Sequence, residues 1–335
     1  MAIQSYISGL GFNVPDKVMK NHELSDYMDT SDEWIQERSG IKERRVVERC
    51  KTDGVGPAEL AIPAVLDALK MANLSKEDID FIIFSTAMPD YFLPGSGCLL
   101  QDKMDFPTIG ALDIRAQCAG FIYGLDIADQ YIKSGRYKNI LLVCSEVQST
   151  TIDYSNRGRD VAVLFGDGCG AVTVSSTNEK RGILSTHLHS QGKYAKELWI
   201  ETPSAQMFPR LTNEMVEDGK HHLQMNGREV FKQAVRRFPE VIRECLDYNN
   251  LKVEDIKLFL PHQANIRINK MVQKSLGLKD SQVLNNIDIY GNTTSATIPI
   301  LLTEAYQKNL IKKGDFILMA AFGSGFIWGA SIIQW

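Results

Sequence analysis

A cysteine near the middle of the chain lies where a nucleophile would be expected. Cys118, in the sequence QCAGF, precedes a segment to Lys133 whose apolar residues keep the spacing of one helix face. At a helix N-terminus, unpaired backbone N–H groups and the positive end of the dipole favour a thiolate, which attacks carbonyl groups. We therefore predict that Cys118 is a nucleophile with a lowered pKa. The alternative is a buried thiol that only packs.

A histidine and an asparagine occupy comparable positions in the second half of the chain. His262 follows an apolar segment that is typical of a strand, and the polar run QANIR comes next. Asn292 follows a strand-like segment that reaches Gly291, and a predicted helix begins around it. In α/β proteins, ligands collect at strand ends and helix starts, so we expect these two side chains to converge with Cys118. For His262, a buried structural role is the alternative.

Other motifs for metals and nucleotides are absent from the sequence. The remaining histidines lack the spacing of a metal site, and no CxxC motif exists. The glycines of GSGFIWG lack the lysine of a phosphate-binding loop, so we expect them to allow close backbone approach and to expose an N–H to an oxyanion. No bound metal is predicted.

The elements that must position these residues are repeated along the chain. NLSKEDIDFIIF at 73–84 and NLKVEDIKLFLP at 250–261 match at five positions, 177 residues apart. Each copy follows a helical segment and contains an apolar strand, and KNILLV at 138–143 and GDFILM at 314–319 lie at nearly the same spacing. We infer that the chain consists of two similar halves, 1–178 and 179–335.

Composition limits the class of protein. The chain has 335 residues, of which 44% are apolar and 23% charged, with a net charge of −4, so a packed core is expected and nucleic acid is not an expected partner. No signal peptide and no apolar run of membrane-spanning length is visible, which predicts a cytoplasmic protein without membrane insertion. Its six cysteines are then expected to be reduced thiols.

Several of these segments together resemble the β-ketoacyl-acyl-carrier-protein synthase III family. They are SDEWIQERSGIKERR at 31–45, QCAGF around Cys118, FGDGCGA at 165–171, PHQANIRI at 261–268, YGNTTSATIP at 290–299 and AFGSGFIWG at 321–329. The resemblance covers essentially the whole chain. It implies an α/β thiolase-like fold of two duplicated halves in layered α-β-α-β-α order, and a homodimer.

The resemblance also implies an activity and a role for each site residue. Cys118 would take an acyl group from acyl-CoA, and His262 with Asn292 would hold the thioester carbonyl of malonyl-acyl-carrier protein during decarboxylation. The backbone N–H groups of Cys118 and Ser324 would form a second oxyanion hole. The substrate-binding residues implied are Trp34, Arg38 and Arg159 for CoA, Lys232 and Arg267 for the acidic carrier protein, Asn265, and Phe322 over the cysteine. Acyl-CoA is a substrate, and no cofactor is implied.

This chain departs from the family pattern in places that leave alternatives open. Arg157 competes with Arg159 for the CoA nucleotide. The stretch 192–222 is longer than usual and rich in apolar residues, and with Phe92 and Leu93 donated across the dimer it could wall an acyl tunnel that prefers about C6 to C12 over acetyl.

Two other functions remain as alternatives. One is a long-chain acyl-CoA or secondary-metabolite condensing enzyme with the same three residues. Three second substrates therefore stay open: malonyl-carrier protein, malonyl-CoA and another acyl-CoA. The other is a Cys118–His262 thioesterase.

Overall fold

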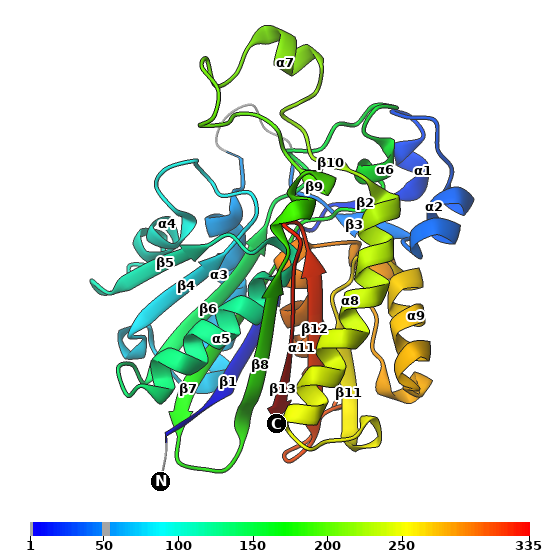
Figure 1. The fold of residues 1–335 in the computed structure, drawn as a ribbon. Coiled ribbons are helices and arrows are strands. Elements are labelled where there is room, and N and C mark those ends of the chain that lie inside the picture. The colour runs from blue at the N-terminus through cyan, green and yellow to red at the C-terminus, as the bar shows by residue number, and fades with distance from the viewer. Residues whose placement is uncertain (1–2, 49–53) are drawn as a thin grey trace.

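The computed structural model describes residues 3–48 and 54–335, and two mixed β-sheets form its framework (Figure 1). The first sheet contains, in spatial order, β1 (Gln4–Asn13), β7 (Gly168–Thr177), β6 (Asn139–Glu146), β4 (Phe81–Ser85) and β5 (Gly110–Ile114). The second contains β8 (Gly182–Ser190), β13 (Ile327–Gln334), β12 (Phe316–Gly323) and β11 (Ile256–Pro261). In both sheets the first three strands pair antiparallel, and the remaining pairs are parallel.

The repeated order of elements predicted from the sequence is present. Strand β12 begins and ends 177 residues after β6, and the 3-10 turn η6 (Thr294–Ala296) lies at the same spacing from η2 (Gln117–Ala119). Both turns begin with a residue in the left-handed region, with φ of 41° at Gln117 and 52° at Thr294. Cys118 and the segment after Asn292 therefore occupy equivalent places in the two halves.

Helices form three layers around the sheets. Helices α5 (Gly120–Lys133) and α11 (Thr297–Gln307) lie between the two sheets, where Leu125 and Leu301 pack in one cluster with strand residues of both. Helices α3 (Pro57–Ala72) and α4 (Ser96–Lys103) cover the outer face of the first sheet, and α8 (Gly227–Tyr248) with α9 (Ile266–Leu276) cover that of the second. The predicted α-β-α-β-α arrangement is confirmed.

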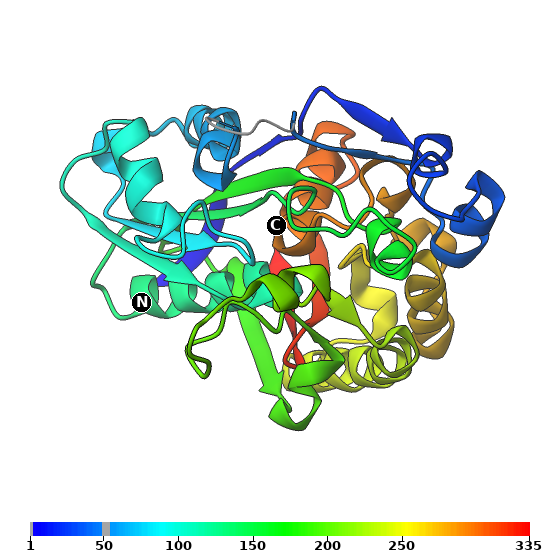
Figure 2. The ribbon, with the colours of Figure 1, turned by 90° about the horizontal axis from the view of Figure 1, so that it is seen from above.

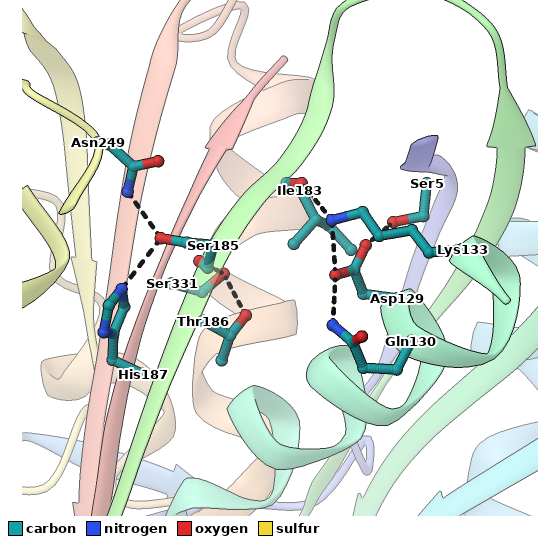
Figure 3. Close-up of polar contacts among 10 residues, drawn as sticks. All are labelled: Ser5, Asp129, Gln130, Lys133, Ile183, Ser185, Thr186, His187, Asn249 and Ser331. Atoms are coloured by element: carbon teal, nitrogen blue, oxygen red, sulfur yellow. Dashed lines mark hydrogen bonds and ion pairs between the residues drawn. The ribbon is translucent and has the colours of Figure 1, made fainter. Parts of the chain in front are cut away.

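Polar contacts join these layers as well (Figure 3). Asp129 of α5 accepts a hydrogen bond from Ser5 of β1, in the first sheet. Lys133 pairs with Asp129 at 2.8 Å and reaches the Ile183 carbonyl of β8, in the second sheet. On the opposite face of β8, Ser185 accepts from Asn249 at 2.6 Å, just after α8. Helix α5 is thus tied to both sheets near its C-terminal end, opposite the end at which Cys118 lies.

Shorter elements gather over one end of the two sheets, where Figure 2 looks down on them. They are β2 (Val18–Lys20), β3 (Glu43–Arg45), β9 (Leu198–Trp199), β10 (Gln224–Met225), α1 (Asn21–Leu24), α2 (Asp32–Ser39), α6 (Arg159–Ala162) and α7 (Asn213–Glu217). None of the described helices has both the length and the apolar character needed to cross a membrane.

One predicted strand is absent. The segment before Gly291 makes a single bridge from Val283 to Phe259, and α10 (Ile287–Tyr290) follows it. The side-chain oxygen of Gln263 accepts hydrogen bonds from the backbone N–H groups of Asn286 and Ile287. These donors are therefore withdrawn from a strand ladder, and a helical turn forms where the apolar pattern predicted a strand.

Candidate active site

Cys118 lies where the sequence predicts it, in η2 and directly before α5. Its residue is only 6% exposed. A Cβ atom added at Gly323, at the end of β12, would come within 2.8 Å of the Cys118 Cβ and 3.0 Å of its backbone nitrogen. The predicted close approach of a glycine backbone is confirmed, because no larger residue fits against the cysteine at this position.

Two cavities meet at Cys118. The first, of about 450 Å³, contains His262 and Asn292, and we call it the His262 cavity. The second, of about 680 Å³, contains neither of these residues but is lined by Trp199, and we call it the Trp199 cavity. Cys118, Phe165 and Leu198 line both. The sulfur therefore stands at the junction of two spaces, which suits a nucleophile that receives a group from one side and holds it on the other.

His262 presents one ring nitrogen to its cavity. The residue follows β11 and is 1% exposed. Its Nδ1 lies 2.7 Å from the Thr297 hydroxyl, whereas Nε2 is buried and has no hydrogen-bond partner among the described residues. Burial lowers the pKa of His262 to about 3, so the imidazole is neutral at physiological pH. This nitrogen is buried, lines the same cavity as Cys118 and has no hydrogen-bond partner there, so it can bind a substrate atom.

Asn292 presents its amide group to the same cavity. The Thr294 backbone N–H donates to Asn292 Oδ1 at 2.9 Å. The Nδ2 group is therefore the part of the side chain that remains to donate a hydrogen bond in the cavity. The Asn292 backbone is held on both sides, because its N–H donates to Leu164 and its carbonyl accepts from Gly166. His262 and Asn292 can thus provide two neutral donors for one oxygen.

The predicted lowering of the Cys118 pKa is wrong for the free chain. Burial raises the pKa of Cys118 to about 12, and the nearby carboxyl group of Glu146 raises it further, while a backbone N–H acts in the opposite direction. Glu146 is itself buried between the halves, where it accepts from Ser295 Oγ at 2.5 Å and from the Ala87 N–H at 3.0 Å. Burial raises the pKa of Glu146 to about 7. The increase in the Cys118 pKa caused by burial is thus larger than the decrease expected from its place at a helix start.

This finding predicts the order in which the cysteines react. Because alkylation needs the thiolate, iodoacetamide at pH 7 should label the exposed Cys98 well before Cys118. Labelling of Cys118 should accelerate about tenfold per pH unit between pH 7 and pH 10, since the thiolate fraction grows at that rate below the pKa. Peptide mass spectrometry measures both rates; Cys50 lies outside the described residues. Labelling of Cys118 before Cys98 at pH 7 would contradict the buried neutral thiol.

The structure separates the two candidate arginines. The guanidinium groups of Arg38 and Arg159 each lie 4.9 Å from the centre of the Trp34 ring. Arg157 instead pairs with Asp153 at 2.6 Å and donates to the backbone carbonyl of Glu217. Trp34 and Arg38 also line the His262 cavity. An aromatic ring with two guanidinium groups is suited to a flat, anionic ligand.

The other predicted substrate residues divide into three groups. Asn265, Arg267 and Phe322 line the His262 cavity, and Ser324 and Phe92 line the Trp199 cavity. Phe92 lines the cavity of its own chain, which differs from the predicted donation across a dimer. Two residues line neither cavity: Lys232, which is exposed on α8 and pairs with Glu229, and Leu93, which is 85% exposed. In the long stretch 192–222, Leu198, Trp199 and Ile200 line the Trp199 cavity, but Met207 and Phe208 do not.

Sequence reasoning missed several residues of the site. Gln117 and Thr294 line the Trp199 cavity, Arg228 and Phe231 line the His262 cavity, and Thr297 contacts His262. Arg228 and Phe231 are within one helical turn of Lys232, so the spacing on α8 could have indicated them. Within residues 3–48 and 54–335, no three His, Cys, Asp or Glu side chains are grouped in a way that could hold a metal ion.

Comparison with known proteins agrees with this geometry. The chain matches 3-oxoacyl-[acyl-carrier-protein] synthase III over residues 112–192 and the C-terminal part of that family over 246–335. It is 42% identical to the β-ketoacyl-[acyl-carrier-protein] synthase III of Clostridioides difficile over 335 residues, covering 100% of this chain and 99% of that protein.

Solved structures extend the comparison to the fold. The 3-oxoacyl-[acyl-carrier-protein] synthase III of Aquifex aeolicus superposes with a TM-score of 0.89 at 40% identity, covering 99% of this chain and 100% of that one. OleA of Xanthomonas campestris, solved with lauric acid and lauroyl-CoA, has a TM-score of 0.84 at 19% identity and 99% coverage of both chains, which shows a shared fold alone. Full-length identity of about 40% together with the cysteine, histidine and asparagine around one junction settles the assignment: the chain belongs to the 3-oxoacyl-[acyl-carrier-protein] synthase III family.

Proposed function

We propose that the protein catalyses the condensation that starts fatty acid synthesis. Acyl-CoA acylates Cys118, and malonyl-acyl-carrier protein then condenses with the acyl group to give 3-oxoacyl-carrier protein and CO₂. The observation that carries this proposal is the convergence of Cys118, His262 and Asn292 in one cavity, with a second cavity open to the same sulfur. A thioesterase would need only the cysteine and a base, so the oriented amide of Asn292 favours condensation.

Acyl transfer uses both cavities. The pantetheine arm of acyl-CoA would occupy the His262 cavity, and the acyl chain would extend into the Trp199 cavity. Attack by the Cys118 sulfur forms the new thioester and breaks the bond to the CoA sulfur, which leaves with a proton. The backbone N–H groups of Cys118 and Ser324 would stabilise the oxyanion of the tetrahedral intermediate. The close approach of Gly323 to Cys118 brings these two segments together.

Condensation uses the two neutral donors. Malonyl-carrier protein would enter the His262 cavity with its thioester oxygen between His262 Nε2 and Asn292 Nδ2. Loss of CO₂ leaves an enolate whose charge these donors stabilise without a metal. The enolate carbon then forms a bond to the acyl carbonyl carbon, and the Cys118 thiolate leaves and takes up a proton.

The two carriers would bind at the mouth of the same cavity. Trp34 with Arg38 and Arg159 forms the proposed site for the CoA nucleotide. Arg228 and Arg267 are exposed at the cavity rim, and Lys232 is exposed beside them on α8. In a chain whose net charge is −4, this local positive surface suits an acidic carrier protein.

We also propose that the active form is a homodimer. Strand β5 is an edge strand whose outer side is not paired with any described strand, and the nearby Tyr91, Phe92 and Leu93 are between 61% and 85% exposed. An unpaired edge beside exposed apolar side chains is a surface that soluble proteins usually cover. A second copy pairing along β5 would cover both.

Light scattering tests the dimer directly. The purified protein should show twice the 37.5 kDa mass of one chain. Leu93→Asp places a charge on the proposed interface without altering a residue that lines either cavity, and it should shift the mass toward that of one chain. A wild-type mass of 37.5 kDa at micromolar concentration would contradict the proposal.

The size of the Trp199 cavity predicts the acyl group. Its volume of about 680 Å³ is far larger than an acetyl group needs, and Phe92, Leu198, Trp199 and Ile200 supply apolar wall. Each buried CH₂ contributes about 0.8 kcal/mol, so several extra carbons can favour a longer chain. We expect kcat/KM to be higher for acyl-CoA of about C6 to C12 than for acetyl-CoA. A kcat/KM for acetyl-CoA at least ~10-fold above that for octanoyl-CoA would contradict this prediction.

One panel tests the proposed function as a whole. Acyl-CoA from two to sixteen carbons is assayed with malonyl-carrier protein, and separately with malonyl-CoA or a second acyl-CoA. Formation of 3-oxoacyl-carrier protein only with malonyl-carrier protein supports the proposal. Condensation of two acyl-CoA molecules would assign the chain to long-chain condensation instead, and release of free acid would assign a thioesterase.

A further inference from the structure

The two donors of the His262 cavity are oriented by one short segment. Asn292 is followed within five residues by Thr294, which fixes the asparagine amide, and by Thr297, which contacts the histidine. Thr297 is the first residue of α11 and is 2% exposed. No other polar group among the described residues forms a hydrogen bond with either ring nitrogen of His262. Thr297 is therefore the one side chain available to decide how the imidazole carries its proton.

A neutral imidazole carries one proton, on either Nδ1 or Nε2, and the two forms have opposite effects in this cavity. With hydrogen on Nε2, the ring can donate to a thioester oxygen. With hydrogen on Nδ1, a lone pair on Nε2 would face that oxygen and repel it. Stabilising an enolate therefore requires the Nε2–H form. The partner of Nδ1 sets the choice, because it must then donate a hydrogen bond to that nitrogen.

The Thr297 hydroxyl has two acceptors within reach and a single hydrogen. Its oxygen lies 2.7 Å from His262 Nδ1 and 3.2 Å from the Thr294 carbonyl oxygen. The 2.7 Å contact can form in either direction, but a proton on Nε2, which stabilising an enolate requires, leaves Nδ1 as an acceptor. Thr297 must then donate to Nδ1, and it gives up its longer contact to the Thr294 carbonyl oxygen.

We infer that Thr297 is a positioning residue that holds His262 in the Nε2–H form required for malonyl decarboxylation. The inference rests on the proposed function, because it assigns Nε2 to the malonyl thioester oxygen. A carboxylate or a backbone carbonyl at this place would only accept, and would therefore select the Nδ1–H form. A hydroxyl can donate, and being uncharged it leaves the buried imidazole neutral.

Three variants of α11 test the inference. Thr297→Val keeps the shape of the side chain and removes the hydroxyl, and Thr297→Ser keeps the hydroxyl. Thr303→Val is the matched control, because Thr303 is also 2% exposed on α11 and its hydroxyl donates only to the Pro299 carbonyl. Release of CO₂ from malonyl-carrier protein and acylation of Cys118 are measured separately.

The expected result is a loss confined to one half-reaction. Thr297→Val should lower decarboxylation about 10- to 100-fold while acyl-Cys118 still forms, and Thr297→Ser and Thr303→Val should stay within about threefold of wild type. Wild-type decarboxylation by Thr297→Val would overturn the inference, and so would an equal loss in Thr303→Val, which would show a structural effect.

Nitrogen NMR of the wild-type protein gives an independent reading. With ¹⁵N-labelled histidine, the resonances of His262 distinguish a protonated nitrogen from a bare one, and His262→Gln identifies them. We expect Nε2 to be protonated in the wild type and a mixture of forms in Thr297→Val. A bare Nε2 in the wild type would overturn the inference even where a variant fails to fold. Absence of decarboxylation by the wild-type protein would instead refute the proposed function.

Discussion

Cys118→Ala is expected to abolish formation of 3-oxoacyl-carrier protein. The alanine has no atom that can accept the acyl group, and Cys118 is the only described cysteine that lines either cavity. Incubation with acyl-CoA should add the acyl mass to the peptide containing Cys118 in the wild type and leave that peptide unmodified in the variant. The donors of the His262 cavity remain in place, so CO₂ release from malonyl-carrier protein should persist.

Cys98→Ala provides the matched control. Cys98 is exposed on α4, away from the junction of the cavities, so its removal should change neither acylation nor condensation. Acyl mass on Cys98 in the wild type, or condensation by Cys118→Ala, would refute the assignment of the nucleophile. Loss of CO₂ release in Cys118→Ala, with the fold intact by circular dichroism, would show that decarboxylation requires the acyl-enzyme.

The positions of the three candidate catalytic residues could be predicted because their signals are local. A cysteine before a helical pattern, a histidine after an apolar strand and an asparagine before a second helix are readable in short windows. The repeat at 177 residues then implied that the windows meet, since equivalent ends of duplicated α/β units face one site. The repeat indicated two similar halves, whereas the layered α-β-α-β-α order was predicted only from the resemblance to the family.

What the sequence could not predict depends on solvent access and on distant contacts. The pattern around Cys118 indicated a helix start but not that the residue would be 6% exposed, and burial reverses the expected pKa shift. Arg157 and Arg159 are two residues apart, and only the fold shows that Arg157 is held by Glu217 from a distant segment. The strand expected before Gly291 is absent because Gln263 takes its backbone donors.

The prediction of which residues line the acyl tunnel was limited in the same way. The apolar residues of 192–222 suggested one continuous lining, and three of them, Leu198 to Ile200, do line the Trp199 cavity. Phe208 is fully exposed instead, and Arg210 from the same loop lies 4.5 Å from the centre of the Phe92 ring. Composition predicts that a loop carries apolar groups, but the side of the loop that faces the cavity is set by its backbone path.

Removal of either donor should separate the two half-reactions. His262→Ala and Asn292→Ala are each expected to lower malonyl decarboxylation about 10²- to 10³-fold, the usual cost of losing one oxyanion donor. Both variants should still form acyl-Cys118, because the start of α5 and the approach of Gly323 do not depend on either side chain. Acylation is followed by intact mass, and decarboxylation by release of labelled CO₂ from malonyl-carrier protein.

The raised pKa of Cys118 makes His262→Ala the more informative of the two variants. A neutral thiol must lose its proton during acyl transfer, and His262 in the Nε2–H form has no lone pair in the shared cavity to accept that proton. Acylation by His262→Ala that rises with pH and approaches the rate of Asn292→Ala would show that solvent can remove this proton. If His262→Ala forms no acyl-enzyme at any pH while Asn292→Ala does, the histidine is the obligatory base for the thiol, and the assignment of its role to decarboxylation alone is wrong.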